Sequence, residues 1–360
     1  MAQDLVPPPR RHQHPGGQRG GSAGPASNFP QGRPGGQTRF QYRKAYAALD
    51  LGTNNCRMLI AKPDGDGFAI IDAFSRIVRL GEGLAQSGRI SDAAVERALS
   101  ALSVCADKLA RRNVHLARSV ATEACRRAEN GREFVDRVYR ETGILLDIIA
   151  PEEEARLAVA GCYKMLEPGE TPGLIFDIGG GSTEMVLVDT RGPLPRTIEW
   201  ISIPWGVVSL AESDDQDAPS AEERIHIYAR MRQRVADAMG DFGMDHRGKG
   251  ASVRLLGTSG TVTTLASVHL GLESYDRKAI DGLIVPSSAM RDISANLARQ
   301  SIAERAELPC IGQERADLVV AGCAILDAIL DYWPSDRVGI ADRGIREGIL
   351  RQLMASGGKR

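Results

Sequence analysis

Two short glycine-containing stretches carry residue types that bind phosphate. "LIFDIGGGSTEMVLVD" (174–189) places Asp177 and three consecutive glycines between two runs of strand-forming residues. Glycine inside a strand lowers stability by roughly 0.5–1 kcal/mol relative to alanine. Three in succession therefore indicate a turn that has a functional or structural role. "ALDLGTNNCRMLIA" (48–61) repeats the layout around Asp50: apolar strand, Asp, apolar residue, Gly, three small or polar residues, second strand.

Glycine turns of this kind are suited to anions, because they expose backbone N–H groups and allow close approach. The expected phosphate-binding residues of the two turns are Thr53, Asn54, Asn55, Gly179, Gly180, Gly181, Ser182 and Thr183. A carboxylate beside phosphate would repel it unless a divalent cation lies between them. Mg²⁺ uses one or two carboxylates together with phosphate oxygens and water, and the expected metal ligands are Asp50, Asp177 and Glu184.

A third glycine turn, "LLGTSGTVTTLA" (255–266), runs from an expected strand into an expected helix. Helix N-termini favour anions, so Gly257, Ser259 and Gly260 are expected to add phosphate contacts. Each of the three stretches, taken alone, could be an ordinary glycine-rich turn. The layout shared by 48–61 and 174–189 argues against that interpretation for these two. None of the three matches the Rossmann or P-loop spacing.

The duplicated stretch predicts the architecture. Asp50 and Asp177 lie 127 positions apart in matching surroundings, and 360 residues are long for one core. Two similar α/β domains facing each other are expected, with a ligand cleft between them. We expect domain I over residues 44–158, completed by a C-terminal helix over 342–356, and domain II over 159–341.

Hydrophobic periodicity and caps locate the elements. Each glycine stretch opens a set of three strands, and "VHLARSVATEACR" (114–126) is expected to be a strand that runs into a loop. The expected helices cover 91–113 with Ser91 as cap, 130–143, 151–166, about 220–240, 261–271, 287–306, 314–332 and 342–353. Further strands are expected at 144–150, 252–260 and 337–341.

Composition excludes several classes of protein. No run of about 18 apolar residues exists, so no membrane span is expected. The six cysteines form no CxxC pair and no cluster with histidine, so a zinc site is not expected. Reduced thiols favour a cytoplasmic protein. The net charge of −1 means that affinity for a polyanion must arise locally.

Residues 1–43 differ from the rest of the chain. Gly, Pro, Gln and Arg dominate, with few aliphatic residues, which predicts a disordered basic tail. The tail is either a dispensable solvated segment or a basic arm that touches an anionic polymer; a nucleic-acid partner is not expected, although the tail leaves it open. The apolar helix near 316–330 is either core or the surface of a homodimer.

At these motifs the chain resembles the exopolyphosphatase/guanosine pentaphosphate phosphohydrolase family, within the actin/Hsp70/sugar kinase superfold. The matching stretches follow the family order across residues 45–350. They are "ALDLGTNNCRMLIA", "RIVRLGEGL", "VATEACRRAEN", "IIAPEEEARLAVAG", "FDIGGGSTEMVLV", "LGTSGTVTTLA", "ERADLVVAGCAIL" and "ADRGIREGIL". The "EEEARL" element upstream of "DIGGGSTE" is the most particular of them.

The resemblance implies two ribonuclease H-like domains around a cleft, and Mg²⁺-dependent hydrolysis of a terminal phosphoanhydride of polyphosphate or guanosine pentaphosphate. It places the catalytic glutamate at Glu154, phosphate-loop aspartates at Asp50 and Asp177, and basic positions at Arg79 and Arg126. It also implies a short, two-domain member, because no His-Asp dipeptide of an additional hydrolase domain occurs.

Alternatives remain at this level. "TNNC" and "ATEACR" depart from the commoner family patterns "SNS" and "ATSALR". From spacing alone, "PEEEAR" reads as three acids that stabilise a helix N-terminus, and Arg126 reads equally well as part of a solvated turn. An ATP-dependent kinase or ATPase of the same superfold, or a non-catalytic regulator that binds guanosine pentaphosphate, are the rival functions. The sequence does not distinguish polyphosphate from guanosine pentaphosphate.

Overall fold

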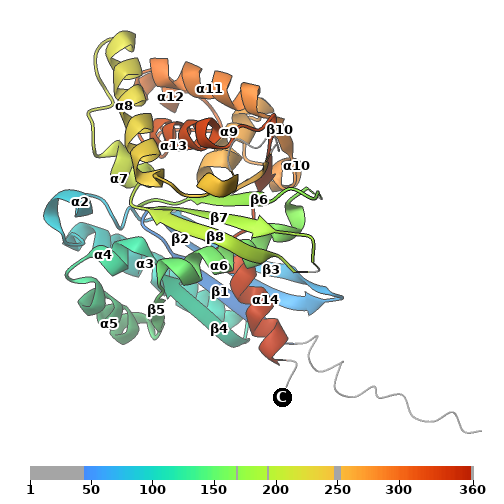
Figure 1. Cartoon of the computed structure of the whole chain (residues 1–360). Helices are drawn as coiled ribbons and strands as arrows, with labels where there is room; N and C mark the ends of the chain where they lie inside the picture. Colours follow the sequence, from blue (N-terminus) through green and yellow to red (C-terminus); the bar gives the residue numbers. More distant parts are fainter. Residues whose placement is uncertain (1–43, 168, 193, 247–252, 358–360) are drawn as a thin grey trace, which may run out of the picture.

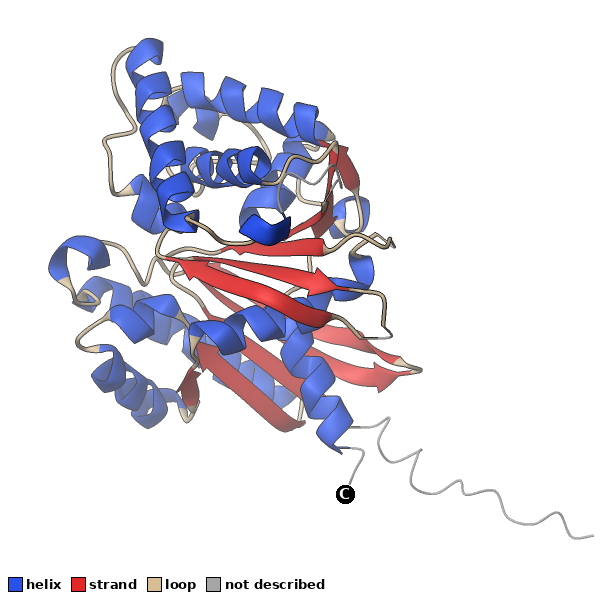
Figure 2. Ribbon diagram, viewed as in Figure 1, coloured by secondary structure: helices blue, strands red, loops and turns tan. Residues whose placement is uncertain are grey.

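The computed structural model describes residues 44–167, 169–192, 194–246 and 253–357, so the predicted tail lies outside the described residues. Two β-sheets lie one above the other, each with helices on both faces (Figures 1 and 2). The first sheet has five strands in the order β3-β2-β1-β4-β5. These are β1 Ala45–Leu51, β2 Asn55–Asp64, β3 Gly67–Ile77, β4 Val114–Ala121 and β5 Leu146–Ile148.

The second sheet has six strands in the order β10-β11-β9-β6-β7-β8. These are β6 Gly173–Ile178, β7 Thr183–Asp189, β8 Arg196–Ile203, β9 Arg254–Thr258, β10 Ile284–Pro286 and β11 Arg337–Ala341. Reading β8-β7-β6-β9-β11 against β3-β2-β1-β4-β5 gives the same topology: an antiparallel three-strand meander followed by two parallel strands. The duplication in the sequence is therefore a duplication of fold, and both halves are ribonuclease H-like, as expected.

Helices cover the sheets in layers. Those of the first half are α2 Leu84–Ser87, α3 Asp92–Arg111, α4 Glu123–Arg127, α5 Gly131–Thr142 and α6 Pro151–Cys162, followed by the 3₁₀ turn Tyr163–Met165. Those that follow along the chain are α7 Val207–Ala211, α8 Ala221–Met239, the 3₁₀ turn Met244–His246, α9 Gly260–His269, α10 Arg277–Ile280, α11 Ser287–Arg299, α12 Ile302–Ala306, α13 Val319–Tyr332 and α14 Ile345–Gly357; α14 returns to the first sheet.

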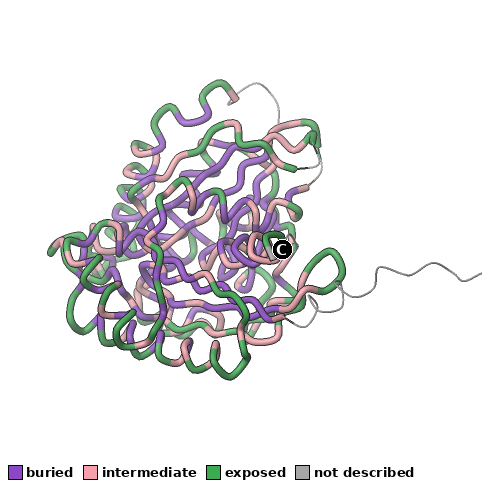
Figure 3. Tube along the Cα trace, turned by 90° about the horizontal axis from the view of Figure 1, so that it is seen from below, coloured by how far each residue is buried: buried purple, intermediate pink, exposed green. Residues whose placement is uncertain are grey.

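Alternating side chains of the central strands feed different cores, because successive strand residues point to opposite faces. On β1, Leu49 and Leu51 pack with α3 and α5, whereas Tyr46 and Ala48 pack with α6 and α14. On the second sheet, Phe176 faces the large core beneath α8, α9, α11 and α13. The buried positions accordingly run through the middle of the molecule (Figure 3).

Helix α6 lies between the two sheets, and α14 packs on α6 and on the first sheet. Leu157 and Ala158 of α6 pack with the first sheet, while Ala155 and Val159 pack with the second. The boundary predicted between residues 158 and 159 falls inside α6, which contacts both sheets. Helix α14 packs through Ile349 on α6 and β1, so the last helix of the chain lies against the first strand.

Local chemistry explains where the elements differ from expectation. The loop predicted after β4 contains the helix α4, and α2 was not predicted at all; both are only one turn long. The helix predicted over 287–306 is broken, because Ser301 caps a new helix, α12, by accepting from the Glu304 N–H. Helix α13 begins at Val319 rather than 314, after a run of turns. Among the described residues, no helix is long and apolar enough to cross a bilayer, and the six cysteines are unpaired.

Candidate active site

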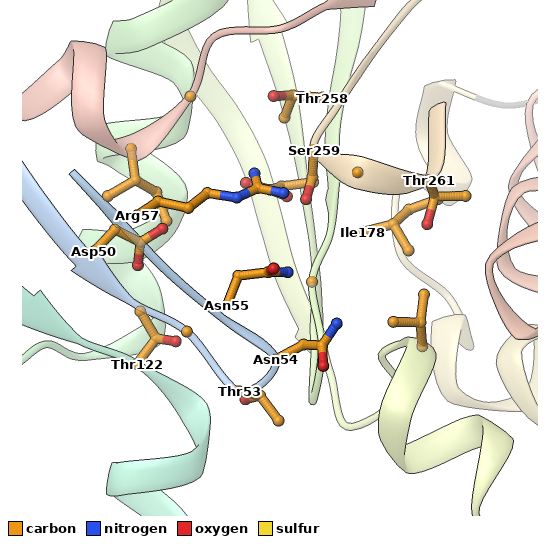
Figure 4. A pocket seen from close by; sticks show the side chains of 18 of the residues that line it. Asp50, Thr53, Asn54, Asn55, Arg57, Thr122, Ile178, Thr258, Ser259 and Thr261 are labelled. Carbon is orange, nitrogen blue, oxygen red and sulfur yellow. The ribbon is translucent and has the colours of Figure 1, made fainter. Parts of the chain in front are cut away.

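The tips of the two glycine hairpins meet across a cleft between the sheets (Figure 4). The backbone turns are equivalent: the Gly52 N–H donates to the Asn55 carbonyl at 2.9 Å, and the Gly179 N–H donates to the Ser182 carbonyl at 3.0 Å. The predicted residues that line the cleft are Asp50, Thr53, Asn54, Asn55, Glu154, Asp177, Gly179, Gly180, Gly181, Ser182, Glu184, Ser259 and Gly260. Residues that lie more than 200 positions apart in sequence thus share one wall.

The close approach of the tips explains the run of glycines. A Cβ atom on Gly180 would lie 2.8 Å from the Thr53 Cβ, and one on Gly181 would lie 1.8 Å from Glu123 Oε2. Side chains at these positions would force the hairpins apart. Glycine here is therefore required by contact between the two halves, in addition to the backbone donors it exposes.

The second hairpin is held so that its N–H groups remain available. The N–H groups of Val207 and Val208, at the start of α7, donate to the carbonyls of Gly179 and Gly180 at 3.0 and 2.7 Å. Within the described part of the chain, the N–H groups of Gly180, Gly181 and Ser182 make no hydrogen bond. Consecutive free N–H groups at a turn form an anion-binding nest.

Glu154 differs from the neighbouring acid Glu153. Glu153 pairs with Arg118 at 2.9 Å and Arg156 at 2.7 Å, as an ordinary acid of a helix N-terminus does. Glu154 lines the cleft with 7% of its surface exposed, and its Oε2 accepts from Arg126 Nη1 at 2.8 Å. Burial and the Glu184 charge raise the pKa of Glu154 well above its usual value, while Arg126 lowers it.

The two aspartates lie near each other in the cleft. Burial, then Glu184 and Asp50, raise the pKa of Asp177 to about 7. Burial also raises the pKa of Asp50, whose Oδ1 atom is buried without a hydrogen-bond partner. Glu184 is paired in register with Asp177 and accepts from Ser182 and Ser202 at 2.7 and 2.8 Å.

These acids fit a divalent cation. Within residues 44–357, apart from the gaps, no group of three His, Cys, Asp or Glu side chains is placed to hold a metal ion, so Asp50, Asp177 and Glu184 do not form such a group. Mg²⁺ needs only one or two carboxylates, with water and phosphate oxygens completing its shell. The unpartnered Asp50 Oδ1 and the nearby Asp177 are hard oxygen donors of this kind.

Four arginines that the sequence did not single out line the same cleft: Arg57, Arg315, Arg343 and Arg346. Arg343 is paired with Asp281 at 2.8 Å. Arg57 lies opposite Asp50 in the β1–β2 register, at the position that Glu184 occupies in the second hairpin. Its Nη2 atom would lie 3.6 Å from a Cβ on Gly260, so Arg57 reaches across to the start of α9 (Figure 4). The sequence signal that could have identified Arg57 is that an arginine stands where the second hairpin, otherwise similar, has Glu184.

The third turn brings the α9 N-terminus to this cluster. Ser259, which precedes α9, has φ 80° and ψ −174°, a conformation that non-glycine residues adopt rarely and at a cost. Ser259 and Gly260 line the cleft, whereas Gly257 does not. A Cβ on Gly257 would lie 2.7 Å from the Phe176 ring, so glycine there serves the packing of β9 on β6.

Three other predicted residues point elsewhere. Arg79 pairs with Asp317 at 2.8 Å, outside the cleft lining. The Thr183 hydroxyl donates to the Trp205 carbonyl at 2.7 Å and is fully buried. Arg126 lies behind Glu154 rather than in the wall, and it also donates to the Ile149 carbonyl at 2.8 Å.

The fold and the cleft together define an α/β protein of the actin/Hsp70/sugar kinase superfold. A structure from Aquifex aeolicus, described as a Ppx/GppA family member, matches with a TM-score of 0.70 and 28% identity, covering 88% of this chain and 99% of that one. The model of the Ppx/GppA phosphatase family matches residues 59–356. This chain therefore belongs to the Ppx/GppA phosphatase family.

Relatives of known name support the same family. A putative exopolyphosphatase of Haemophilus influenzae is 29% identical over 308 residues, which cover 85% of this chain and 90% of the relative. Exopolyphosphatase 2 of Mycobacterium tuberculosis is 28% identical over 322 residues, which cover 85% of this chain and 98% of the relative.

Proposed function

We propose that this protein is an exopolyphosphatase that releases orthophosphate from the end of inorganic polyphosphate. The observation that carries the proposal is a buried carboxylate, Glu154, in the wall of a cleft where two phosphate-type hairpins meet. The family and the exopolyphosphatases among its relatives support the same reaction class. In-line attack of water on a terminal phosphorus requires charge neutralisation and an oriented water molecule.

Glu154 would orient the attacking water and accept its proton. Its pKa, raised by burial and by Glu184, makes it a stronger base than an exposed glutamate. Arg126 donates to Oε2 at 2.8 Å, which fixes the direction of the carboxylate, and its positive charge lowers the pKa of Glu154. Arg126 is thereby a positioning residue.

The phosphate groups would bind to the free N–H groups of the second hairpin and to the cleft arginines. Asp50 and Asp177, with Glu184 behind them, would hold Mg²⁺. The cation would neutralise charge on the phosphate oxygens when it is bound.

Guanosine pentaphosphate is a second candidate substrate, because its terminal phosphoanhydride is the same type of bond and the family name covers both activities. Incubating the protein and Mg²⁺ with each substrate and comparing kcat/KM decides between them. Phosphate release from polyphosphate without any nucleotide separates this function from a kinase or ATPase, and turnover of either substrate excludes a purely regulatory role.

Glu154→Gln tests the assignment of the base. We expect kcat on polyphosphate to fall by about 10²–10⁴-fold, since general-base catalysis contributes that much, with an unchanged melting temperature. Glu153→Gln is the matched control, one residue earlier on the same helix, and should retain most of the activity. Turnover of Glu154→Gln close to that of the parent protein would remove the assignment.

A further inference from the structure

Arg346, in the first turn of α14, lines the cleft with its guanidinium unpaired. No ion pair or hydrogen bond involves its side chain among the described residues. It is half-buried, so water satisfies it only in part. Long basic side chains in proteins usually reach solvent or an acid, and an arginine that does neither fully is available to a ligand.

The acids nearest to Arg346 in sequence are already paired with another arginine. Asp342 Oδ2 and Glu347 Oε1 lie 3.1 and 3.0 Å from the Arg277 guanidinium, and Glu347 also accepts from the Gly344 N–H at 2.9 Å. Both carboxylates near Arg346 are therefore ion-paired with Arg277. Arg346 is left facing the cleft without a counter-ion from its own helix.

Two charged groups of the cleft, Asp50 and Arg57, lie close enough to Arg346 to be influenced by it. Burial raises the pKa of Asp50, and Arg346 is the charge that lowers it most, followed by Arg57. Burial lowers the pKa of Arg57 and the positive charge of Arg346 lowers it further, while the carboxylates of Asp50 and Asp342 raise it. Two neighbouring guanidinium groups repel each other, and an anion between them would convert that repulsion into attraction.

Backbone packing fixes Arg346 relative to Glu154. A Cβ on Gly161 of α6 would lie 2.0 Å from the Gly344 carbonyl oxygen, and one on Gly348 of α14 would lie 2.1 Å from the Leu157 carbonyl oxygen. Helices α6 and α14 therefore touch backbone to backbone at two points. Glu154 lies in the first turn of one helix and Arg346 in the first turn of the other.

We propose that Arg346 is a substrate-binding residue that, together with Arg57, holds the phosphate group adjoining the one under attack. The inference rests on the proposed function. Arg57 and Arg346 line the same cleft as Glu154, and each of them lies close enough to Asp50 to influence its pKa. The polyanion would lie with its terminal phosphate beside Glu154 and the next phosphate between Arg57 and Arg346.

The test compares Arg346→Gln and Arg346→Lys with the parent protein. Binding of tripolyphosphate with Mg²⁺ is measured by calorimetry in the Glu154→Gln background, and kcat and KM are measured in the active protein. We expect Arg346→Gln to weaken binding and raise KM by about 10- to 100-fold, the range for a charge-assisted hydrogen bond. Arg346→Lys, which keeps the charge but loses the planar fork, should recover part of the loss.

Stability separates a binding role from a structural one. Removing one of two repelling cations should leave the melting temperature unchanged or raise it, whereas loss of a structural contact would lower it. Arg140→Gln, an exposed arginine on α5, is the matched control and should change neither binding nor KM. Unchanged tripolyphosphate affinity and KM in Arg346→Gln would overturn the inference even if polyphosphate is hydrolysed. Weakened tripolyphosphate binding would support it even if hydrolysis failed.

Discussion

At the scale of single residues, Glu154 and Arg126 form one unit. Arg126 donates to the carboxylate at 2.8 Å and to the Ile149 carbonyl at the same distance, so it links the base to the loop that precedes α6. Both side chains are largely buried: 18% of the Arg126 side chain and 9% of the Glu154 side chain are exposed. A buried ion pair fixes geometry more reliably than it adds stability.

Arg126→Gln is expected to shift the pH dependence of the reaction. The base acts in its deprotonated form, so activity is lost as pH falls through the pKa of Glu154. Because Arg126 lowers that pKa, its removal should move the acidic limb of the kcat–pH profile to higher pH and reduce kcat at neutral pH by about 10- to 100-fold.

The control for this prediction is Arg156→Gln. Arg156 pairs with Glu153, the acid beside the base, and its side chain is 55% exposed. The acidic limb should stay where it is in this variant. An unshifted limb in Arg126→Gln would contradict the positioning role of Arg126.

At the scale of elements, the α6–α14 contact places the site. Glycine at positions 161 and 348 allows the two backbones to touch, and Leu157 and Ile349 fill the space beside the contact. The contact places Glu154 and Arg346 on two helices whose backbones touch. Side chains on helices in such contact keep their relative positions when the hairpins move.

Gly161→Ala is expected to destabilise the protein. The added Cβ would lie 2.0 Å from a backbone oxygen of Gly344, which cannot swing away as a side chain can. Overpacking of this kind costs about 1–3 kcal/mol, and chemical denaturation measures it. Gly67→Ala adds the same methyl group where the nearest atom is 3.7 Å away and should be nearly neutral. Equal stability of the two variants would show that the helices can separate without cost.

At the scale of the whole molecule, polar contacts join the two halves at one side of the cleft. Arg79 of the first half pairs with Asp317 of the second at 2.8 Å, and the Gly83 N–H donates to Glu212 Oε1 at 2.9 Å. Together with the touching hairpin tips, these contacts join the two halves beside the cleft. Arg79 therefore contacts the opposite half of the protein rather than the cleft.

A double-mutant cycle of Arg79→Ala and Asp317→Ala should show a small coupling in KM. Both side chains are about one-third exposed (33% and 32%), and ion pairs at such positions contribute about 0.2–1 kcal/mol. We expect KM to rise no more than about five-fold, with kcat unchanged, because closure precedes the chemical step. Arg89→Ala and Glu129→Ala, an exposed pair within the first half at 3.5 Å, should show no coupling in KM. If the effects of Arg79→Ala and Asp317→Ala on KM are additive, the ion pair does not contribute to bringing the two halves together around the substrate.

Sequence alone determined the two hairpins, their duplication and the α/β class. Strand patterns, glycine turns and helix caps are local features. Asp50, Asp177 and most residues of the two glycine turns could therefore be found without coordinates. The resemblance supplied Glu154, since spacing does not separate it from Glu153. Short helices such as α2 and α4 escaped prediction, because a single turn carries too little periodicity to detect.

Tertiary structure decided which charged groups face the ligand. Arg57 and Arg346 come from strand β2 and helix α14, at nearly opposite ends of the described chain, and only folding shows that they share a wall. Arg79 and Arg126 were equally basic in sequence, yet one pairs across the cleft and the other behind the base. Whether an arginine binds a phosphate or a carboxylate depends on which partner the fold brings within about 3 Å, and such partners lie far away along the chain.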